Sequence, residues 1–264
     1  MLLISDLHLE ARRPDITDAL LNFLRHKAPA ASQLYILGDL FEAWIGDDAP
    51  DPMADRVATA LRELADSGTN IHLMHGNRDF LLGDDFAERC GARLIEEPWL
   101  LEIAGKRLAL LHGDILCTRD TAYQEFRRLV RDPAWQQEFL DKPLSERQEF
   151  ARQARQQSRQ ATTTSAAEIM DVTGSAVASL FEDLDADVVI HGHTHRPAIH
   201  DLPGDDGKAV RRRRRRVVLG DWDKSGWYGE ISDSGNVTLT EFPLAVHWQE
   251  KSGQKKSGQA KPST

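Results

Sequence analysis

The chain has 264 residues, of which 41% are hydrophobic and 28% charged, and its formal charge at pH 7 is −9. This composition predicts a folded globular protein and excludes collagen-like, disulfide-stapled and wholly disordered chains. Only two cysteines are present and no apolar run approaches the 18 residues of a membrane-spanning helix. We therefore expect a protein of a reducing compartment, without a membrane anchor or a signal peptide.

Short apolar runs that end abruptly in polar residues predict buried strands in the first three quarters of the chain. They are residues 2–5, 34–37, 71–74, 108–111 and 188–190. Residues 14–27 carry apolar side chains at helical spacing, and a second such segment runs from Met53 to Leu64 and ends near Gly68. Strands that alternate with helices favour a parallel sheet, which binds ligands at the carboxyl ends of its strands.

The pattern changes after residue 100. Residues 101–103 and 107–111 flank Ala104-Gly105-Lys106 and predict a hairpin, while residues 120–185 favour helices and contain a long polar insertion at 145–167. Four further short strands are predicted at residues 198–202, 217–220, 227–232 and 237–242. We expect the later strands to form a second, mostly antiparallel sheet that faces the first, with helices outside.

Polar clusters stand where the apolar runs end. They are Asp6-Leu7-His8, Gly38-Asp39, Gly76-Asn77-Arg78-Asp79, His112-Gly113-Asp114 and Gly192-His193-Thr194-His195. A single polar residue at a strand end is ordinarily a turn or cap residue, but five ordered clusters predict one shared site. Carboxylate, amide and imidazole donors without a thiolate favour Mn²⁺, Fe²⁺ or Zn²⁺. Two neighbouring cations repel each other and need a shared carboxylate, for which Asp39 is the candidate.

These clusters resemble, in kind and order, those of the calcineurin-like metallophosphoesterase superfamily. The longer motifs at residues 6–9, 35–48, 75–83 and 190–197 resemble the family of UDP-2,3-diacylglucosamine diphosphatases of lipid A biosynthesis. The resemblance runs from Met1 to about Phe242. It implies an α/β fold in which two mixed sheets lie face to face with helices outside, an αββα sandwich. It also implies a catalytic domain at residues 1–247 with a helical cap insertion at about 120–170, before a disordered basic tail at 248–264.

The resemblance implies the residues of the site as well. One metal ion would be held by Asp6, His8, Asp39 and His195, and a second by Asp39, Asn77, His112 and His193. The implied catalytic residues are Asp39, Arg78 and His112, and the implied substrate contacts are Asn77, Arg78, Asp120, Ser158, Thr162, Ser165 and His193. Ser165 departs from the family, which commonly has a lysine there. The implied cofactors are two Mn²⁺ ions, with other divalent transition metals as alternatives.

The implied reaction is hydrolysis of the diphosphate bond of UDP-2,3-diacylglucosamine to UMP and 2,3-diacylglucosamine 1-phosphate (lipid X). A metal-bridging hydroxide would attack the α-phosphorus. Arg78 fits this bond because arginine cannot protonate a leaving alkoxide, as the histidine of the broad superfamily can, and a phosphate leaving group needs no proton. The alternative is another substrate for the same chemistry, such as a dinucleoside polyphosphate or a phosphomonoester.

Several neighbouring residues are expected to support the site. Asp79 would orient Arg78 and Asp114 would orient a ligating histidine, with simple turn capping as the alternative. Trp44 would belong to the core, with stacking on substrate as the alternative. The inserted helices carry apolar residues that would pack a cap or line a chamber for two acyl chains. These residues are Phe126, Leu129, Val130, Trp135, Phe139, Leu140 and Phe150.

An arginine run begins at Arg211 and ends at Arg216, just before a predicted strand. We interpret it either as a solvated loop or as a contact with anionic lipid, which would bring the enzyme to a membrane-dissolved substrate. The rest of the chain is acidic, so no nucleic-acid partner is expected, although a nucleic-acid-binding protein that uses this run is the alternative from another class. We expect a cytoplasmic monomer that associates peripherally with the cytoplasmic face of the inner membrane.

Overall fold

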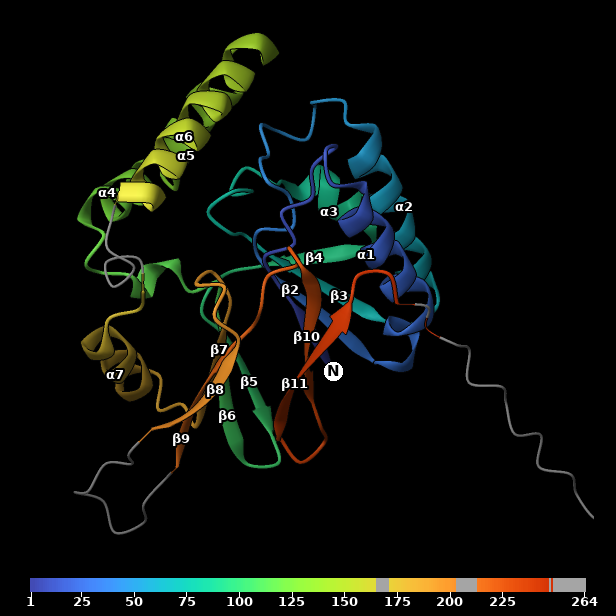
Figure 1. Cartoon of the computed structure of the whole chain (residues 1–264), viewed down its shortest axis with the longest axis vertical. Helices are drawn as coiled ribbons and strands as arrows, with labels where there is room; N and C mark the ends of the chain where they lie inside the picture. Colours follow the sequence, from blue (N-terminus) through green and yellow to red (C-terminus); the bar gives the residue numbers. More distant parts are fainter. Residues whose placement is uncertain (165–170, 203–212, 247, 249–264) are drawn as a thin grey trace, which may run out of the picture.

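Two sheets form the body of the protein, shown in Figure 1 as a computed structural model that describes residues 1–164, 171–202, 213–246 and 248, with the side chains of 159–164 left aside. The six-stranded sheet has the order β11-β10-β1-β2-β3-β4, and the five-stranded sheet has the order β5-β6-β7-β9-β8. The strands of the first sheet are β1 (Leu2–Ile4), β2 (Gln33–Leu37), β3 (Asn70–Met74), β4 (Ala92–Ile95), β10 (Ser225–Ile231) and β11 (Val237–Pro243). Those of the second are β5 (Trp99–Ile103), β6 (Lys106–Leu110), β7 (Val188–His191), β8 (Ala198–Leu202) and β9 (Arg214–Val218).

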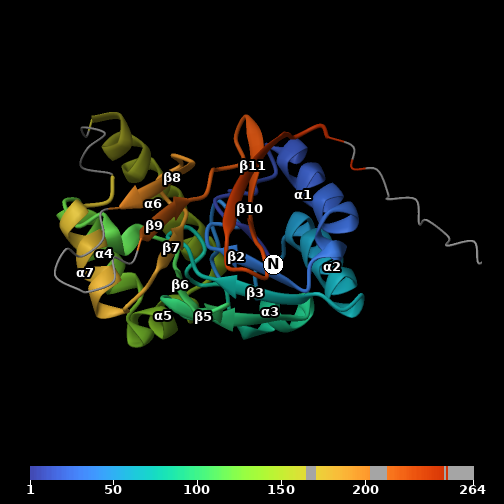
Figure 2. The same ribbon diagram turned by 90° about the horizontal axis from the view of Figure 1, so that it is seen from below.

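Helices cover the outer faces of both sheets. The described helices are α1 (Pro14–His26), α2 (Pro52–Asp66), α3 (Asp84–Cys90), α4 (Thr121–Val130), α5 (Pro133–Leu140), α6 (Leu144–Thr164) and α7 (Gly174–Asp183), with short 3-10 turns η1 (Ala28–Ala30) and η2 (Asp114–Leu116). The first three lie beside the six-stranded sheet and α7 beside the five-stranded one (Figure 2). Among the described residues, no helix combines the length and the apolar character that crossing a bilayer requires.

Alternate residues of each strand face different layers, as a pleated strand dictates. Leu2 and Ile4 of β1 pack with the residues of α1 and α2, whereas Leu3 packs between the two sheets. On the far side, Val189 of β7 packs with Phe181 of α7. Burying one such side chain stabilises the fold by about 1.5–3 kcal/mol. The layers are therefore helix, sheet, sheet and helix, which confirms the predicted αββα sandwich.

The expectation that all later strands form a mostly antiparallel second sheet is wrong. β10 and β11 join the first sheet, where Leu2 of β1 pairs antiparallel with Glu230 of β10. In the second sheet, β6, β7 and β9 run parallel to one another. β1 is buried, so its second edge needs a hydrogen-bonding partner. The alternation of residues predicted β10 as a strand, but it carries no information about which strand it would pair with.

The loop interpretation of the arginine run, residues 211–216, is wrong for its last three members, which lie in β9. Arg211 and Arg212 lie outside the described residues. Arg214 Nη1 lies 3.8 Å from a carboxylate oxygen of Glu182, and Arg215 Nε donates to Asp201 at 3.0 Å. Part of the positive charge of this run is therefore paired within the protein.

Helices α4, α5 and α6, here called the cap helices, lie in sequence between β6 and β7, and α6 rises beside the sandwich in Figure 1. Asp120 and Asp132 accept hydrogen bonds from the first turns of α4 and α5, so each is an N-cap. Buried Arg147 fixes α6 to the loop after β2, because its Nη1 donates to the carbonyl of Ile45 and to Asp48, both at 2.7 Å.

The end of the described chain packs on the first sheet and its helices. The ring of Trp248 lies 5.4 Å from that of Phe242 and 6.4 Å from that of Phe23. The packed part of the molecule therefore extends to this residue. The predicted tail, residues 248–264, is therefore wrong for its first residue, and residues 249–264 lie outside the described residues.

Candidate metal centre and active site

The five polar clusters converge at the carboxyl ends of the strands that precede them. Asp6 follows β1, Asp39 follows β2 and Asn77 follows β3, all in the first sheet. His112 follows β6 and His193 follows β7 in the second sheet. Both sheets therefore contribute residues to one site, and the site forms only when the two sheets pack together.

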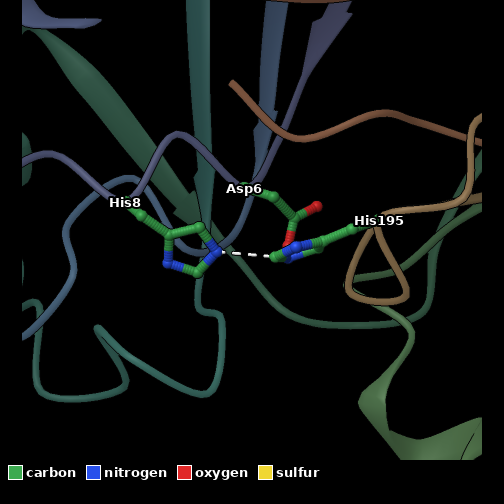
Figure 3. Close-up of side chains that lie close together, drawn as sticks. All are labelled: Asp6, His8 and His195. Atoms are coloured by element: carbon green, nitrogen blue, oxygen red, sulfur yellow. Dashed lines mark hydrogen bonds and ion pairs between the residues drawn. The ribbon is translucent and has the colours of Figure 1, made fainter. Parts of the chain in front are cut away.

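One half of the site consists of Asp6, His8 and His195 (Figure 3). His195 Nε2 lies 3.3 Å from a carboxylate oxygen of Asp6 and 3.2 Å from His8 Nε2. The outer Nδ1 atoms lie near carboxylates, that of His8 3.2 Å from Glu42 and that of His195 3.5 Å from Asp221. Because these carboxylates attract the Nδ1 protons, both Nε2 lone pairs point into the same space. Two facing lone pairs and a carboxylate fit a cation between them.

The other half consists of Asp39, Asn77, His112 and His193. The amide oxygen of Asn77 lies 2.9 Å from His112 Nε2 and 2.9 Å from His193 Nδ1. His112 Nδ1 donates to the carbonyl of Leu37 at 2.9 Å, so its Nε2 carries a lone pair. Acceptor atoms at hydrogen-bonding distance from one another repel unless a proton or cation lies between them. This half therefore also fits a metal ion.

Asp39 lies between the two halves. Its Oδ2 atom is 3.7 Å from His8 Nε2 and 3.8 Å from His112 Nε2, and its other oxygen accepts the backbone N–H of Arg78 at 2.8 Å. Ligand atoms of Asp6, Asp39 and His112 all lie within 4.8 Å of one another. This position is what a carboxylate shared by two cations requires.

The backbone of the site is strained. Five candidate ligands have φ angles between 49° and 66°, in the left-handed region that side chains disfavour: Asp6, His8, Asp39, His193 and His195. Two glycines make room for the carboxylates. A Cβ atom at Gly76 would lie 2.0 Å from Asp39 Oδ1, and one at Gly192 would lie 2.1 Å from Asp6 Oδ2. Such strain is typical of functional sites, where the rest of the fold holds residues in place.

Burial and nearby charges set the protonation of the ligands. Burial alone would raise the pKa of Asp6, but the hydrogen bond and charge of His195 hold it well below its usual range. Burial raises the pKa of Asp39. Burial would lower the pKa of His112, but the negative charges of Asp39 and Asp114 outweigh it and raise the value to about 9. The site therefore attracts positive charge, which protons supply when metal is absent.

Asp79 does not orient Arg78 but caps turns, which is the alternative interpretation of this residue. Its carboxylate accepts the backbone N–H groups of Leu40 at 2.7 Å, Gly76 at 2.8 Å and Asp39 at 3.2 Å. These donors belong to the turns after β2 and β3, and backbone donors near a carboxylate are satisfied by it before a mobile side chain is. Asp79 therefore joins the two turns that carry Asp39 and Asn77.

Asp114 does not orient a ligating histidine directly, contrary to expectation. It accepts hydrogen bonds from Arg127 Nε at 2.9 Å and from the hydroxyl of Tyr123, both on α4. Arg127 also bonds Glu97, whose second oxygen accepts the backbone N–H of His112 at 2.9 Å. Sequence reasoning missed Glu97 and Arg127. Glu97 follows the apolar end of β4, the same signal that identified the other clusters.

Three of the implied substrate contacts lie together beside the metal ligands. Arg78, Asp120 and Ser158 line one cavity, in which Arg78 Nη2 donates to Ser158 Oγ at 3.2 Å. One oxygen of Asp120 accepts the N–H of Tyr123 as the N-cap of α4. Ser165 and the side chain of Thr162 lie outside the described residues. Sequence reasoning also missed Arg155, which lines the same cavity and lies 3.2 Å from Glu42.

The cavity has a volume of about 660 Å³ and joins the candidate metal ligands to the cap helices. Its polar end is lined by His8, Asp39, Asn77, Arg78, His193 and His195. Its other end is lined by the apolar residues Trp44, Phe80, Leu81, Phe126, Phe139 and Phe150. Trp44 is buried as predicted, with its ring 4.7 Å from that of Phe41, but it also forms part of this wall. The cavity suits a molecule with an anionic head and apolar chains.

Comparison with known proteins agrees with this geometry. The family model of calcineurin-like phosphoesterases matches residues 1–197. A UDP-2,3-diacylglucosamine hydrolase of Marinobacter nauticus is 51% identical over 92% of this chain and 98% of its own length. The proteins of the same name from Stenotrophomonas maltophilia and Pseudomonas fluorescens are 50% and 48% identical, covering 90% and 89% of this chain and 96% and 92% of their own lengths.

Proposed function

Because this chain belongs to the calcineurin-like phosphoesterase family, and UDP-2,3-diacylglucosamine hydrolases are among its relatives, we propose that it hydrolyses UDP-2,3-diacylglucosamine. It is a metal-dependent hydrolase that cleaves the diphosphate bond and releases UMP and 2,3-diacylglucosamine 1-phosphate, in lipid A biosynthesis. The observation that carries this proposal is the single cavity with metal ligands at one end and an aromatic wall at the other. A nucleotide sugar with two acyl chains has the same division of polarity.

Two divalent cations form the centre. Imidazole, amide and carboxylate donors without a thiolate suit Mn²⁺, Fe²⁺ or Zn²⁺, and we propose Mn²⁺ because the family resemblance implies it. Asp6, His8, Asp39 and His195 would hold one ion, and Asp39, Asn77, His112 and His193 the other. When bound, such ions make hydroxide available at neutral pH for attack on the α-phosphorus and neutralise phosphate charge.

The side chains around the centre then bind and orient the diphosphate. Arg78 directs its fork of N–H donors into the cavity, where it neutralises phosphoryl oxygens and supplies no proton. The leaving group is a phosphate monoester, which departs without protonation. Asp39 and His112 would act as ligands that hold the metal ions beside the reacting phosphorus. The substrate contacts are Asn77, Arg78, Asp120, Ser158, Thr162, Ser165 and His193.

The cap helices supply the apolar end of the cavity, and we propose that it holds the acyl chains. Each methylene group removed from water there contributes about 0.8 kcal/mol to binding. In this proposal the catalytic domain extends from residue 1 to Trp248, with the cap insertion at about 120–170, and the tail is residues 249–264. Phe126, Phe139 and Phe150 are the cap residues that line this end.

The substrate is a membrane lipid, so we place the protein in the cytoplasm as a monomer at the anionic face of the inner membrane. The first three arginines of the run remain the proposed lipid contact, and Arg213 is exposed. Each basic residue near such a surface contributes about 1 kcal/mol. A variant with Arg211, Arg212 and Arg213 changed to Gln should bind anionic vesicles more weakly than the unchanged protein. Equal vesicle binding would contradict the contact.

The function is tested with purified, metal-stripped protein given Mn²⁺ and UDP-2,3-diacylglucosamine. We expect Mn²⁺-dependent release of UMP, and hydrolysis in ¹⁸O-water should place the label in UMP because the α-phosphorus is attacked. Label in the acyl-sugar phosphate would contradict that assignment. Faster cleavage of a dinucleoside polyphosphate or an aryl phosphate would favour the alternative substrates.

Asp39→Asn removes the shared carboxylate. It should bind less Mn²⁺ and release UMP at least about 100-fold more slowly, the upper end of the loss for residues that only orient ligands. Asp85→Asn, an exposed carboxylate in α3, is the control and should keep full activity. Wild-type metal content in Asp39→Asn would refute the shared ligand.

A further inference from the structure

We propose that Arg216, the last residue of the arginine run, is a positioning residue for the candidate metal ligand Asp6, acting through His191 and the peptide that joins Gly192 to His193. The proposal rests on the proposed function only for the presence of the metal centre. It assigns a role to two residues that neither the motifs nor the resemblance explained.

The path starts in the second sheet. Arg216 Nη1 lies 3.2 Å from Nε2 of His191, whose side chain is fully buried, and His191 Nδ1 lies 2.8 Å from the carbonyl oxygen of Gly192. A carbonyl only accepts, so the Nδ1 atom carries the proton. The Nε2 atom of the neutral ring is then an acceptor, and the guanidinium donates to it. The geometry therefore defines the direction of both hydrogen bonds.

The same peptide group reaches the metal centre on its other side. Its carbonyl belongs to Gly192 and accepts from His191, while its N–H belongs to His193 and donates to both carboxylate oxygens of Asp6, at 2.9 and 3.1 Å. Hydrogen bonding at the carbonyl polarises the N–H, and successive bonds in a buried site strengthen one another. A fixed positive charge at Arg216 therefore helps to hold the Asp6 carboxylate in place.

The ring of His191 also contacts the neighbouring ligand loop. A Cβ atom at Gly113 would lie 2.7 Å from its Nδ1 atom, so the ring packs directly against the residue after His112. The N–H of Gly192 donates to the carbonyl of His112 at 2.9 Å. One imidazole thus sets the spacing of the two turns that carry His112 and His193. Moving this ring would displace ligands of both proposed ions.

The arginine run provides its own control. Arg215 is adjacent in β9, carries the same charge and pairs with Asp201 of β8, away from the metal ligands. Successive residues of a strand face opposite sides of the sheet, so Arg215 cannot replace Arg216. Any effect of total charge in the run would appear equally in variants of both residues.

The test measures Mn²⁺ affinity of metal-stripped protein by titration calorimetry, without substrate, beside thermal unfolding of the metal-free protein. Arg216→Gln should bind Mn²⁺ about tenfold more weakly, the range for partners of metal ligands. Arg216→Lys should recover part of the affinity because an ammonium still donates one hydrogen bond. Arg215→Gln should match the unchanged protein, and all variants should unfold near the same temperature when metal-free.

A second variant tests the path itself. His191→Phe keeps a ring but removes both hydrogen bonds, and should lose as much affinity as Arg216→Gln. The double variant should lose no more than either single one, because both substitutions interrupt one chain of bonds. Losses that add in the double variant would show independent roles and overturn the path.

Two other results would also overturn the proposal. The first is wild-type affinity in Arg216→Gln. The second is an equal loss of affinity in the Gln and Lys variants together with a matching loss of metal-free stability, which is the mark of a merely structural residue. Failure of the protein to hydrolyse UDP-2,3-diacylglucosamine would instead refute the proposed function and leave these affinities interpretable.

Discussion

The energetic cost of the left-handed backbone in the site can be measured at His8. Its φ angle is 49°, which costs a residue with a Cβ atom about 1–2 kcal/mol and costs glycine nothing. We therefore predict that metal-free His8→Gly is more stable than metal-free His8→Ala by about 1 kcal/mol in urea unfolding, although both bind Mn²⁺ poorly. Without strain, the alanine variant would be the more stable one by about 0.4–1 kcal/mol, because glycine loses more conformational entropy on folding, and that result would contradict the prediction.

Arg78 is the second residue whose substitution should have a defined effect, in this case on kcat/KM. Its guanidinium is the forked donor of the polar cavity end, and a lysine keeps the charge without the fork. We expect Arg78→Gln to lower kcat/KM about 100-fold or more and Arg78→Lys to fall between it and the wild type. Arg128→Gln, an exposed arginine of α4, should be unaffected. Equal kcat/KM in Arg78→Gln and the wild type would exclude a role in charge neutralisation.

The sequence predicts individual residues only where a local signal exists. The candidate ligands could be named because each follows an apolar run at a strand end. Asp79 was misassigned because its sequence neighbour is Arg78, whereas its carboxylate turns to backbone donors of two loops. Arg127 and Arg155 lie on polar helices, where nothing distinguishes them from solvated arginines until the helices are placed against the site.

At the scale of elements, Arg147 connects α6 with the loop after β2. Its side chain is 3% exposed, and besides Asp48 it donates to the carbonyls of Ile45 and Lys142. Arg147→Ala leaves these acceptors unpaired, so it should lower the free energy of unfolding by about 2 kcal/mol and raise KM more than it lowers kcat. The exposed Arg152→Ala in the same helix is the control. A change confined to kcat would contradict a role in placing the cap.

Protonation of His72 in β3 should make the stability of the packing between the two sheets depend on pH. Its ring stacks on Tyr35 at 4.5 Å, and neither ring nitrogen has a hydrogen-bond partner among the described residues. Burial, and then the positive charge of Arg93, lower the pKa of His72. The unfolded chain therefore binds the proton first, and the contribution of His72 to stability should be constant above about pH 6.5 and fall below it.

The measurement for His72 is the free energy of unfolding between pH 7.5 and 5. His72→Phe should lose less stability across this window than the wild type, because it removes the group that protonates only on unfolding. His26→Phe in α1 is the histidine control. Identical slopes for His72→Phe and the wild type would show that other groups account for the acid sensitivity.

The elements themselves were largely predictable, and their partners were not. Strands such as β2 and β3 are mostly apolar, and α1 and α2 carry apolar residues at helical spacing, so local patterns sufficed. β10 pairs with β1, which is far away in the sequence, and no local pattern encodes that choice. The last arginines of the run were misassigned because a strand of charged residues lacks the apolar alternation that predicts strands.

At the scale of the whole molecule, the metal centre should act as a cross-link between the two sheets. Asp6 and Asp39 follow strands of one sheet, and His112 and His193 follow strands of the other. Ions that bind only the folded protein stabilise it, by about 2.7 kcal/mol at 100 times their dissociation constant. Mn²⁺ should therefore raise the unfolding temperature, EDTA should reverse the effect, and Asp39→Asn should respond less. An unfolding temperature that is independent of Mn²⁺ would contradict the shared centre.

The pairing of β1 with β10 has a consequence for the order of biosynthesis. β1 is translated before β10, so one of its two hydrogen-bonding edges stays open until β10 is made. The turn that carries Asp6 and His8 directly follows this strand, and His195 is translated long after them. A nascent chain thus gains hydrolytic competence only after β10 has been translated, and one that stalls earlier is inert.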